Sequence, residues 1–115
     1  MGTYTRQSGS TAPIVVTNTP IAIFTVDTNQ TIAFSFDYTI NRNNSFRTGR
    51  VVVATNGSTN NLSWDDDFTE NSATYPDGNT GVTFSITQTS NIVTVAYTSS
   101  SGPVGTIYYS VTYLV

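Results

Sequence analysis

Hydrophobic and polar residues alternate with a period of two over much of this chain. The clearest example lies between Thr31 and Asn41, where large apolar side chains occupy every second position and small or polar ones lie between them. This period is typical of a β-strand with one face in a core. Burying five such side chains gains on the order of 10 kcal/mol. Ordering eleven residues costs about as much. The segment is therefore expected to be stable only within a sheet.

The same pattern recurs along the chain and is interrupted by turn-forming residues such as Asn56-Gly57 and Ser90-Asn91. Eight strands are expected, near residues 13–17, 20–27, 31–41, 46–55, 61–68, 81–89, 91–99 and 105–115. No window has the period of an amphipathic helix. Many short strands with polar turns predict an all-β fold, an antiparallel eight-stranded β-sandwich of the jelly-roll kind without significant helix.

The first residues differ from the rest of the chain. Residues 1–12 are polar and lack periodicity, so they are expected to form a flexible leader or linker. Residues 13–115 have the usual length of one domain with a single core. The sequence therefore predicts one β-sandwich domain behind a short leader.

Several expected strands carry apolar residues on both faces. Residues 50–54 and 21–24 are examples, and the last strand has Tyr108 and Leu114 on its outer side. A loop could cover such a strand. Alternatively, a second copy of the chain could cover it, because contacts between permanent subunits resemble a core. Four residues are the candidates for such an oligomer interface: Val51, Val53, Tyr108 and Leu114.

Composition excludes many kinds of chemistry. The chain has no histidine, cysteine or lysine, and its net charge is −3. It therefore lacks the usual general base, thiolate nucleophile and zinc ligands. We expect a protein without enzyme activity, metal or cofactor. No basic stripe points to nucleic acid, and no apolar run approaches the length of a membrane span.

The densest group of charged residues is the run Asp65-Asp66-Asp67, followed by Glu70 and Asp77. Calcium prefers such oxygens, but the run lacks the alternating spacing of a calcium loop. Asp65 and Asp67 would lie about 6.7 Å apart on one strand face. That distance is near the carboxylate separation of inverting glycosidases. The simplest interpretation, a solvated strand end, is favoured over both.

Aromatic residues flank this acidic run and suggest a sugar-binding groove. Trp64 precedes it and Tyr75 follows in a long loop, while Asp66 or Asp67 would accept hydrogen bonds from sugar hydroxyls. A single tryptophan in a small β domain is more often part of the core. The candidate ligand-binding residues are Trp64, Asp66, Asp67 and Tyr75.

Short sequence blocks follow one another in a fixed order from Phe46 onward: 46–53, 56–58, 66–70, 81–85, 93–98 and 105–111. In this order they resemble the C-terminal β-modules of tailed-bacteriophage tail fibres and related virion appendages, and the resemblance covers about 60 per cent of the chain. The resemblance implies a non-enzymatic virion protein, commonly a homotrimer, which assembles with other virion proteins. Arg47 and Gly49 in the first block are expected to serve the fold, the arginine by pairing with an acidic neighbour and the glycine by allowing either a bulge or a close approach.

The leading hypothesis is therefore a phage virion module, tail-fibre-like, for assembly and for contact with a host-surface glycan. Its expected partners are copies of itself and other virion proteins, and neither nucleic acid nor membrane insertion is expected. Two alternatives remain, a carbohydrate-binding β-sandwich module and a capsid decoration protein.

Overall fold

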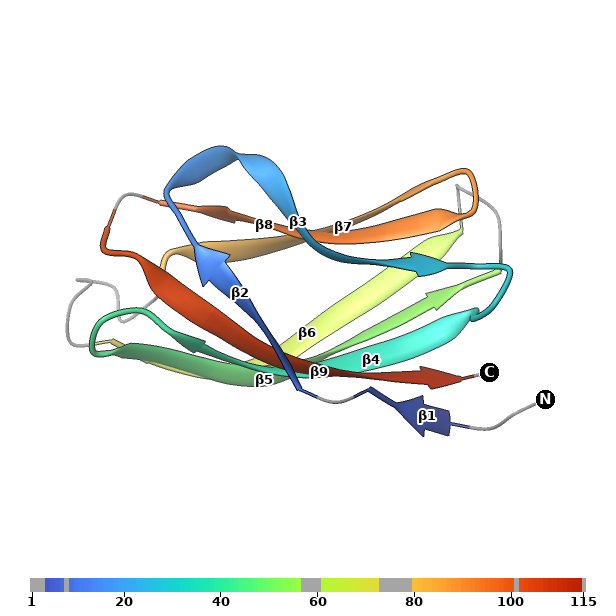
Figure 1. The fold of residues 1–115 in the computed structure, drawn as a ribbon, viewed down its shortest axis with the longest axis horizontal. Coiled ribbons are helices and arrows are strands. Elements are labelled where there is room, and N and C mark those ends of the chain that lie inside the picture. Colours follow the sequence, from blue (N-terminus) through green and yellow to red (C-terminus); the bar gives the residue numbers. More distant parts are fainter. Residues whose placement is uncertain (1–3, 8, 57–60, 73–79, 101, 115) are drawn as a thin grey trace.

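The computed structural model describes residues 4–7, 9–56, 61–72, 80–100 and 102–114, which form an antiparallel β-sandwich (Figure 1). The predicted all-β sandwich is confirmed, and no helix occurs among the described residues. They contain nine strands: β1 (Tyr4–Arg6), β2 (Ser10–Ile14), β3 (Thr17–Asp27), β4 (Ala33–Asn41), β5 (Ser45–Thr55), β6 (Leu62–Ser72), β7 (Val82–Thr89), β8 (Ile92–Ser99) and β9 (Gly105–Leu114).

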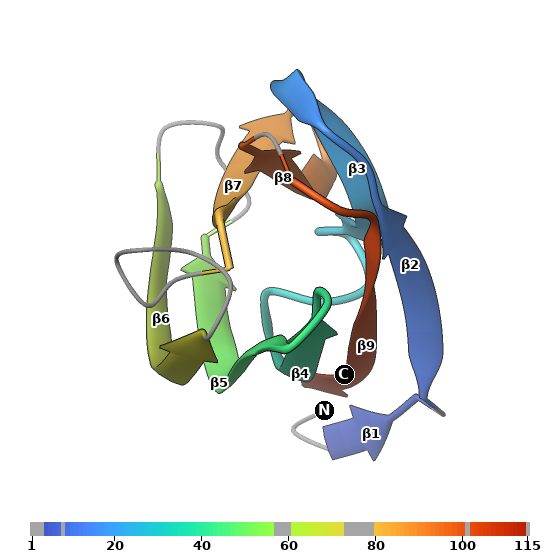
Figure 2. The ribbon, with the colours of Figure 1, turned by 90° about the vertical axis from the view of Figure 1, so that its left-hand side faces the viewer.

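The strands form two unequal layers that face each other (Figure 2). The larger sheet has the order β1-β9-β4-β5-β6, and β2 also pairs with β9. The smaller sheet has the order β3-β8-β7. The chain crosses between the sheets four times, after β2, β3, β6 and β8. Because the smaller sheet has only three strands, it covers the inner face of the larger sheet less completely at the end that β6 forms.

The segment expected to be a leader is largely part of the sheet. β1 and β2 both pair antiparallel with β9, with Tyr4 opposite Leu114 and Ser10 opposite Tyr109. The Gln7 amide also donates to the Val111 carbonyl at 2.7 Å. The domain boundary expected at residue 12 is thus corrected, because backbone hydrogen bonds hold this polar segment without an apolar side-chain pattern.

The core lies between the two sheets. On β4, every second side chain from Phe34 to Ile40 is buried, as the alternation predicts. Ile32 was expected to join this face, but it precedes β4 and is exposed, because the turn after Asp27 extends to Thr31. Aromatic rings connect the layers, with Phe84 of the smaller sheet meeting β4 edge-to-face.

Arg42, at the turn after β4, is fully buried and holds three loop carbonyls. Its guanidinium donates to Thr80 O at 2.9 Å, to Ser100 O at 2.7 Å and to Pro103 O at 2.7 Å. These carbonyls belong to the connections that lead into β7 and out of β8. The Arg42 side chain therefore links the β4–β5 turn to both of these connections at one end of the sandwich.

Gly49 lies on β5 in close contact with the backbone of β6. A Cβ atom at this position would lie 2.5 Å from the carbonyl oxygen of Asp67 and 2.6 Å from Cβ of Phe68. No non-bonded carbon tolerates such distances, so β6 would have to move. The close approach predicted for this glycine is confirmed.

The β4–β5 hairpin provides a test of turn chemistry. Its two loop residues, Asn43 and Asn44, have φ angles of 44° and 43°, and Arg42 and Ser45 exchange backbone hydrogen bonds across them. Two positive φ angles are typical of a type I′ turn, which favours Asn-Gly. We expect Asn44→Gly to raise the free energy of unfolding by about 0.5–1 kcal/mol, measured by urea denaturation.

The matched control is Asn18→Gly, on an exposed strand position of β3 without positive φ. There the same change should lower stability, because glycine loses more backbone entropy in a strand. If both variants changed the free energy of unfolding in the same direction, the turn assignment would be contradicted.

Candidate functional site

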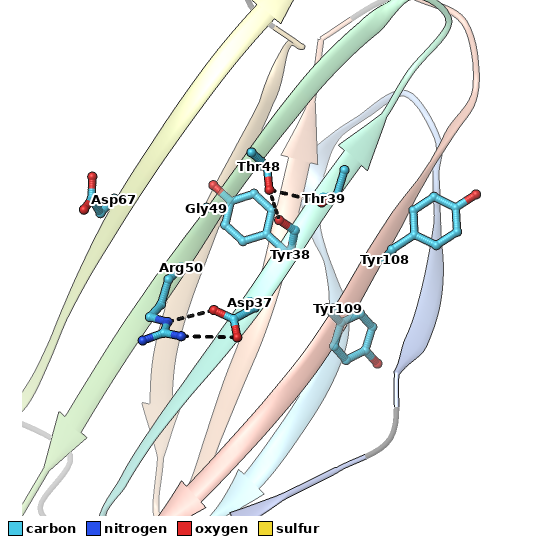
Figure 3. A pocket seen from close by; sticks show the side chains of 9 residues that line it. All are labelled: Asp37, Tyr38, Thr39, Thr48, Gly49, Arg50, Asp67, Tyr108 and Tyr109. Atoms are coloured by element: carbon cyan, nitrogen blue, oxygen red, sulfur yellow. Dashed lines mark hydrogen bonds and ion pairs between the residues drawn. The ribbon is translucent and has the colours of Figure 1, made fainter.

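An open groove of about 590 Å³ lies on the outer face of the larger sheet (Figure 3). It crosses four neighbouring strands, from β6 through β5 and β4 to β9. The residues that line it are Asp37, Tyr38, Thr39, Thr48, Gly49, Arg50, Asp67, Tyr108 and Tyr109. The outward-facing members are mostly charged, hydroxylated or aromatic, so the groove offers both hydrogen-bonding groups and a ring.

Asp37 forms the charged centre of the groove. It pairs with Arg50 through two contacts, of 2.7 Å from Nε and 3.4 Å from Nη2, and with Arg6 at 3.4 Å. The hydrogen bond from Arg50 holds the pKa of Asp37 below its usual value, with further help from the charges of both arginines. The carboxylate therefore stays ionised at neutral pH, and the Arg50 guanidinium is held in place over the sheet.

Hydroxyl and carboxylate groups surround this ion pair. The hydroxyl of Thr48 lies 3.1 Å from that of Thr39, and it also donates to the carbonyl of Tyr38 at 3.2 Å. Asp67 lies opposite Arg50 in the β5–β6 register, but Arg50 turns towards Asp37 instead. Among the described residues the Asp67 carboxylate has no hydrogen-bond or ion-pair partner, so it can accept hydrogen bonds from a ligand.

Two adjacent tyrosines at one end of the groove point to opposite faces of the sheet, as the pleat requires. Tyr109 faces the core and stacks on Phe24 with ring centroids 5.3 Å apart. Tyr108 faces outward and is 49% exposed (Figure 3). Its ring provides an apolar face beside the polar centre of the groove.

The four residues expected to form a sugar groove do not gather in one place. Trp64 and Asp66 share the inner face of β6, whereas Asp67 is on the outer face, because successive strand residues alternate. Tyr75 lies outside the described residues. Trp64 is 40% exposed at the sheet edge, and only Asp67 lines the groove. The predicted grouping is therefore corrected.

Asp66 has a structural partner instead. Its carboxylate forms an ion pair with the buried Arg47 and accepts a hydrogen bond of 2.8 Å from the Tyr38 hydroxyl. Burial raises the pKa of Tyr38, so the hydroxyl remains a donor. Arg47 also stacks on the ring of Phe68 at 4.1 Å. The pairing predicted for Arg47 is confirmed.

The other interpretations of the acidic run gain no support from its geometry. Among the described residues, no group of three or more Asp or Glu side chains is placed to hold a metal ion. Asp77 lies outside those residues. Asp65 and Asp67 share the outer face and are exposed, whereas a glycosidase general acid needs an apolar environment that raises its pKa.

The candidate interface residues divide into two groups. Val51 and Val53 are 0% and 3% exposed, inside the core of the same chain, so they cannot contact a second copy. The outward residue of this segment is Val52, which the sequence pattern alone did not single out. Tyr108 is on the outer face, and Leu114 is partly buried beside β1. The interface role expected for Val51 and Val53 is therefore wrong, because alternation along the strand turns both side chains into the core.

Sequence reasoning missed the charged centre of the groove, namely Asp37 and Arg50. Each is polar at an outward position, which fits a solvated sheet face. Their pairing depends on the register of β4 with β5, in which Asp37 lies opposite Arg50. No signal in the sequence gives that register.

Membrane insertion was not expected. Within the part of the chain that the structure describes, no helix is long and apolar enough to span a bilayer.

No protein-family model matches this sequence, and no curated protein sequence does either. Among solved structures, the chain is similar to the tailspike protein gp49 from Acinetobacter baumannii bacteriophage Fri1, a capsular polysaccharide depolymerase. The TM-score is 0.53 at 13% identity, over 93% of this chain and 17% of that one. A weaker likeness, to the Acinetobacter phage vB_ApiP_P1 tailspike protein, has a TM-score of 0.43 at 10% identity, over 97% and 22% of the two chains.

The first likeness shows a shared fold, and this chain spans less than a fifth of that tailspike. It nevertheless corrects one expectation. The sequence predicted a protein without enzyme activity, whereas the fold occurs as part of a capsular polysaccharide depolymerase.

Proposed function

We propose that this chain is a module of a phage tail appendage, part of the virion, that binds polysaccharide on the host surface through the outer-face groove. The observation that carries the proposal is the recurrence of nearly the whole fold within a tailspike that is a capsular polysaccharide depolymerase. The capsule is the host surface that such a tailspike meets. The open shape of the groove suits a long polymer, which has to lie across a surface and cannot enter an enclosed pocket.

The groove supplies the three groups that sugar recognition needs. The ring of Tyr108 offers a face for the C–H side of a sugar, and the Asp67 carboxylate accepts hydrogen bonds from hydroxyls. Arg50 is fixed by Asp37, so its outward N–H groups are held ready to donate. Preorganised donors reduce the entropy lost on binding.

We expect Tyr108→Ala to weaken binding of the full chain to its polysaccharide about 10-fold, because aromatic residues at binding surfaces each contribute about 1–2 kcal/mol. Arg50→Ala should weaken binding by a similar factor, and it would leave Asp37 paired with Arg6 alone. Binding would be measured by biolayer interferometry on immobilised capsular polysaccharides and on a glycan array.

The matched control is Tyr4→Ala, an exposed tyrosine of β1 outside the groove lining. It should leave affinity unchanged. The proposal fails if no polysaccharide or array glycan binds, or if Tyr4→Ala and Tyr108→Ala reduce affinity equally.

A second candidate function is assembly, with the outer face as a contact between copies in a homotrimer. The observation that favours it is the set of half-exposed apolar side chains on this face: Phe46, Val52 and Tyr108. Light scattering after size-exclusion chromatography separates the two candidates. A trimer that Tyr108→Ala dissociates would support assembly, and a monomer that binds glycan would exclude it.

A further inference from the structure

A second depression lies next to the groove, between β5 and β6, with a volume of about 300 Å³. Val53 and Trp64 complete its lining, and four outward side chains surround it: Val52, Ala54, Ser63 and Asp65. In the strand register Val52 lies opposite Asp65, and Ala54 lies opposite Ser63. An apolar wall on β5 therefore faces a polar wall on β6.

This depression continues the groove along the same two strands. Arg50 and Asp67 belong to the groove and lie opposite each other, one step before the Val52–Asp65 pair. Two residues along a strand correspond to about 6.7 Å. A ligand that passes over Arg50 and follows the strands would therefore meet Val52 next.

The chemistry of the two walls selects a particular group. Val52 is 47% exposed, and Asp65 is exposed without an interaction partner among the described residues. Side chains on opposing strand positions lie about 5 Å apart. A fitting group needs a methyl for the valine and an N–H donor for the carboxylate, next to each other. An acetamido group has both, whereas a sugar hydroxyl has no methyl to cover the apolar wall.

We propose that this depression is a subsite for an acetamido sugar, in a glycan whose neighbouring unit lies in the groove. The proposal rests on the proposed polysaccharide binding. It names the feature that decides which glycans bind: the methyl packs on Val52 and Ala54, and the amide N–H donates to Asp65.

The test uses a glycan array with matched oligosaccharides that differ only by an acetamido or a hydroxyl group at one ring carbon, chitotetraose and cellotetraose among them. The full chain should bind the acetamido form about 10-fold more tightly, which corresponds to about 1.4 kcal/mol. Val52→Thr and Asp65→Ala should each reduce this preference at least about 3-fold. Asp65→Asn keeps an acceptor and should retain most of it.

Val52→Thr keeps a β-branched side chain, and its matched control, Val16→Thr, changes an exposed valine outside the strands. The control should not alter the preference. Equal affinity for both forms, or a preference that neither Val52→Thr nor Asp65→Ala changes, would overturn the subsite while polysaccharide binding stands. Absence of binding to every glycan would overturn the proposed function and the subsite with it.

Discussion

Replacing Arg42 by methionine is expected to lower the free energy of unfolding by at least about 3 kcal/mol. Methionine fills similar space, but the carbonyls of Thr80 and Pro103 would lose the donor that Arg42 supplies, and the Ser100 carbonyl would keep only the Ser99 hydroxyl. A hydrogen bond from a charged group contributes about 1.5–3 kcal/mol, and the Thr80 carbonyl is also buried. The total free energy of unfolding of a domain of this size is about 5–15 kcal/mol. Urea denaturation followed by circular dichroism would measure the loss.

The control for this prediction is Arg6→Met. Arg6 is also an arginine, but its side chain is 59% exposed and its only ion pair among the described residues is the 3.4 Å contact with Asp37. Exposed ion pairs contribute about 0–1 kcal/mol, so this variant should remain close to native stability. A loss below 1 kcal/mol for Arg42→Met would show that the three carbonyls find other donors.

Replacing Gly49 by alanine is expected to lower stability by about 1–3 kcal/mol and to loosen β6 from β5. The new methyl would meet backbone atoms of Asp67 and Phe68, which cannot turn away as a flexible side chain could. Amide hydrogen exchange should show faster exchange along β6, while β7 and β8 keep their protection.

Gly9→Ala is a suitable comparison, because the nearest atom to its added Cβ, the Tyr109 carbonyl oxygen, lies 3.9 Å away. Gly9 has no positive φ, so this change should be neutral or stabilise the fold by up to about 1 kcal/mol. Similar losses from both variants would refute the steric explanation for Gly49.

The fold class could be predicted from the sequence because alternation is a local property. The pattern from Phe34 to Ile40 placed the inner face of β4 correctly. The local pattern gave wrong predictions where the structure of a segment depends on another segment that packs or pairs with it. Residues 4–6 and 10–14 join the sheet through backbone pairing with β9, and Ile32 is exposed because a turn precedes β4.

The candidate site could be predicted only in part. Asp67 was singled out as a hydrogen-bond acceptor for a sugar and Tyr108 as an outward residue of the last strand, and both line the groove. The Asp37–Arg50 pair depends on strand register, and the position of Trp64 depends on the width of the smaller sheet. Neither quantity is encoded in a short stretch of residues.

The position of β6 at the end of the larger sheet has a consequence for solubility. An edge strand presents free backbone groups that can recruit another chain and start aggregation. β6 carries Asp65, Asp66, Asp67 and Glu70 within its eleven residues. Asp65 and Asp67 are the exposed members of this run, and Asp66 is paired with Arg47. Two such strands brought together in solution would repel each other through these two carboxylates, which protects this edge of the sandwich from uncontrolled pairing.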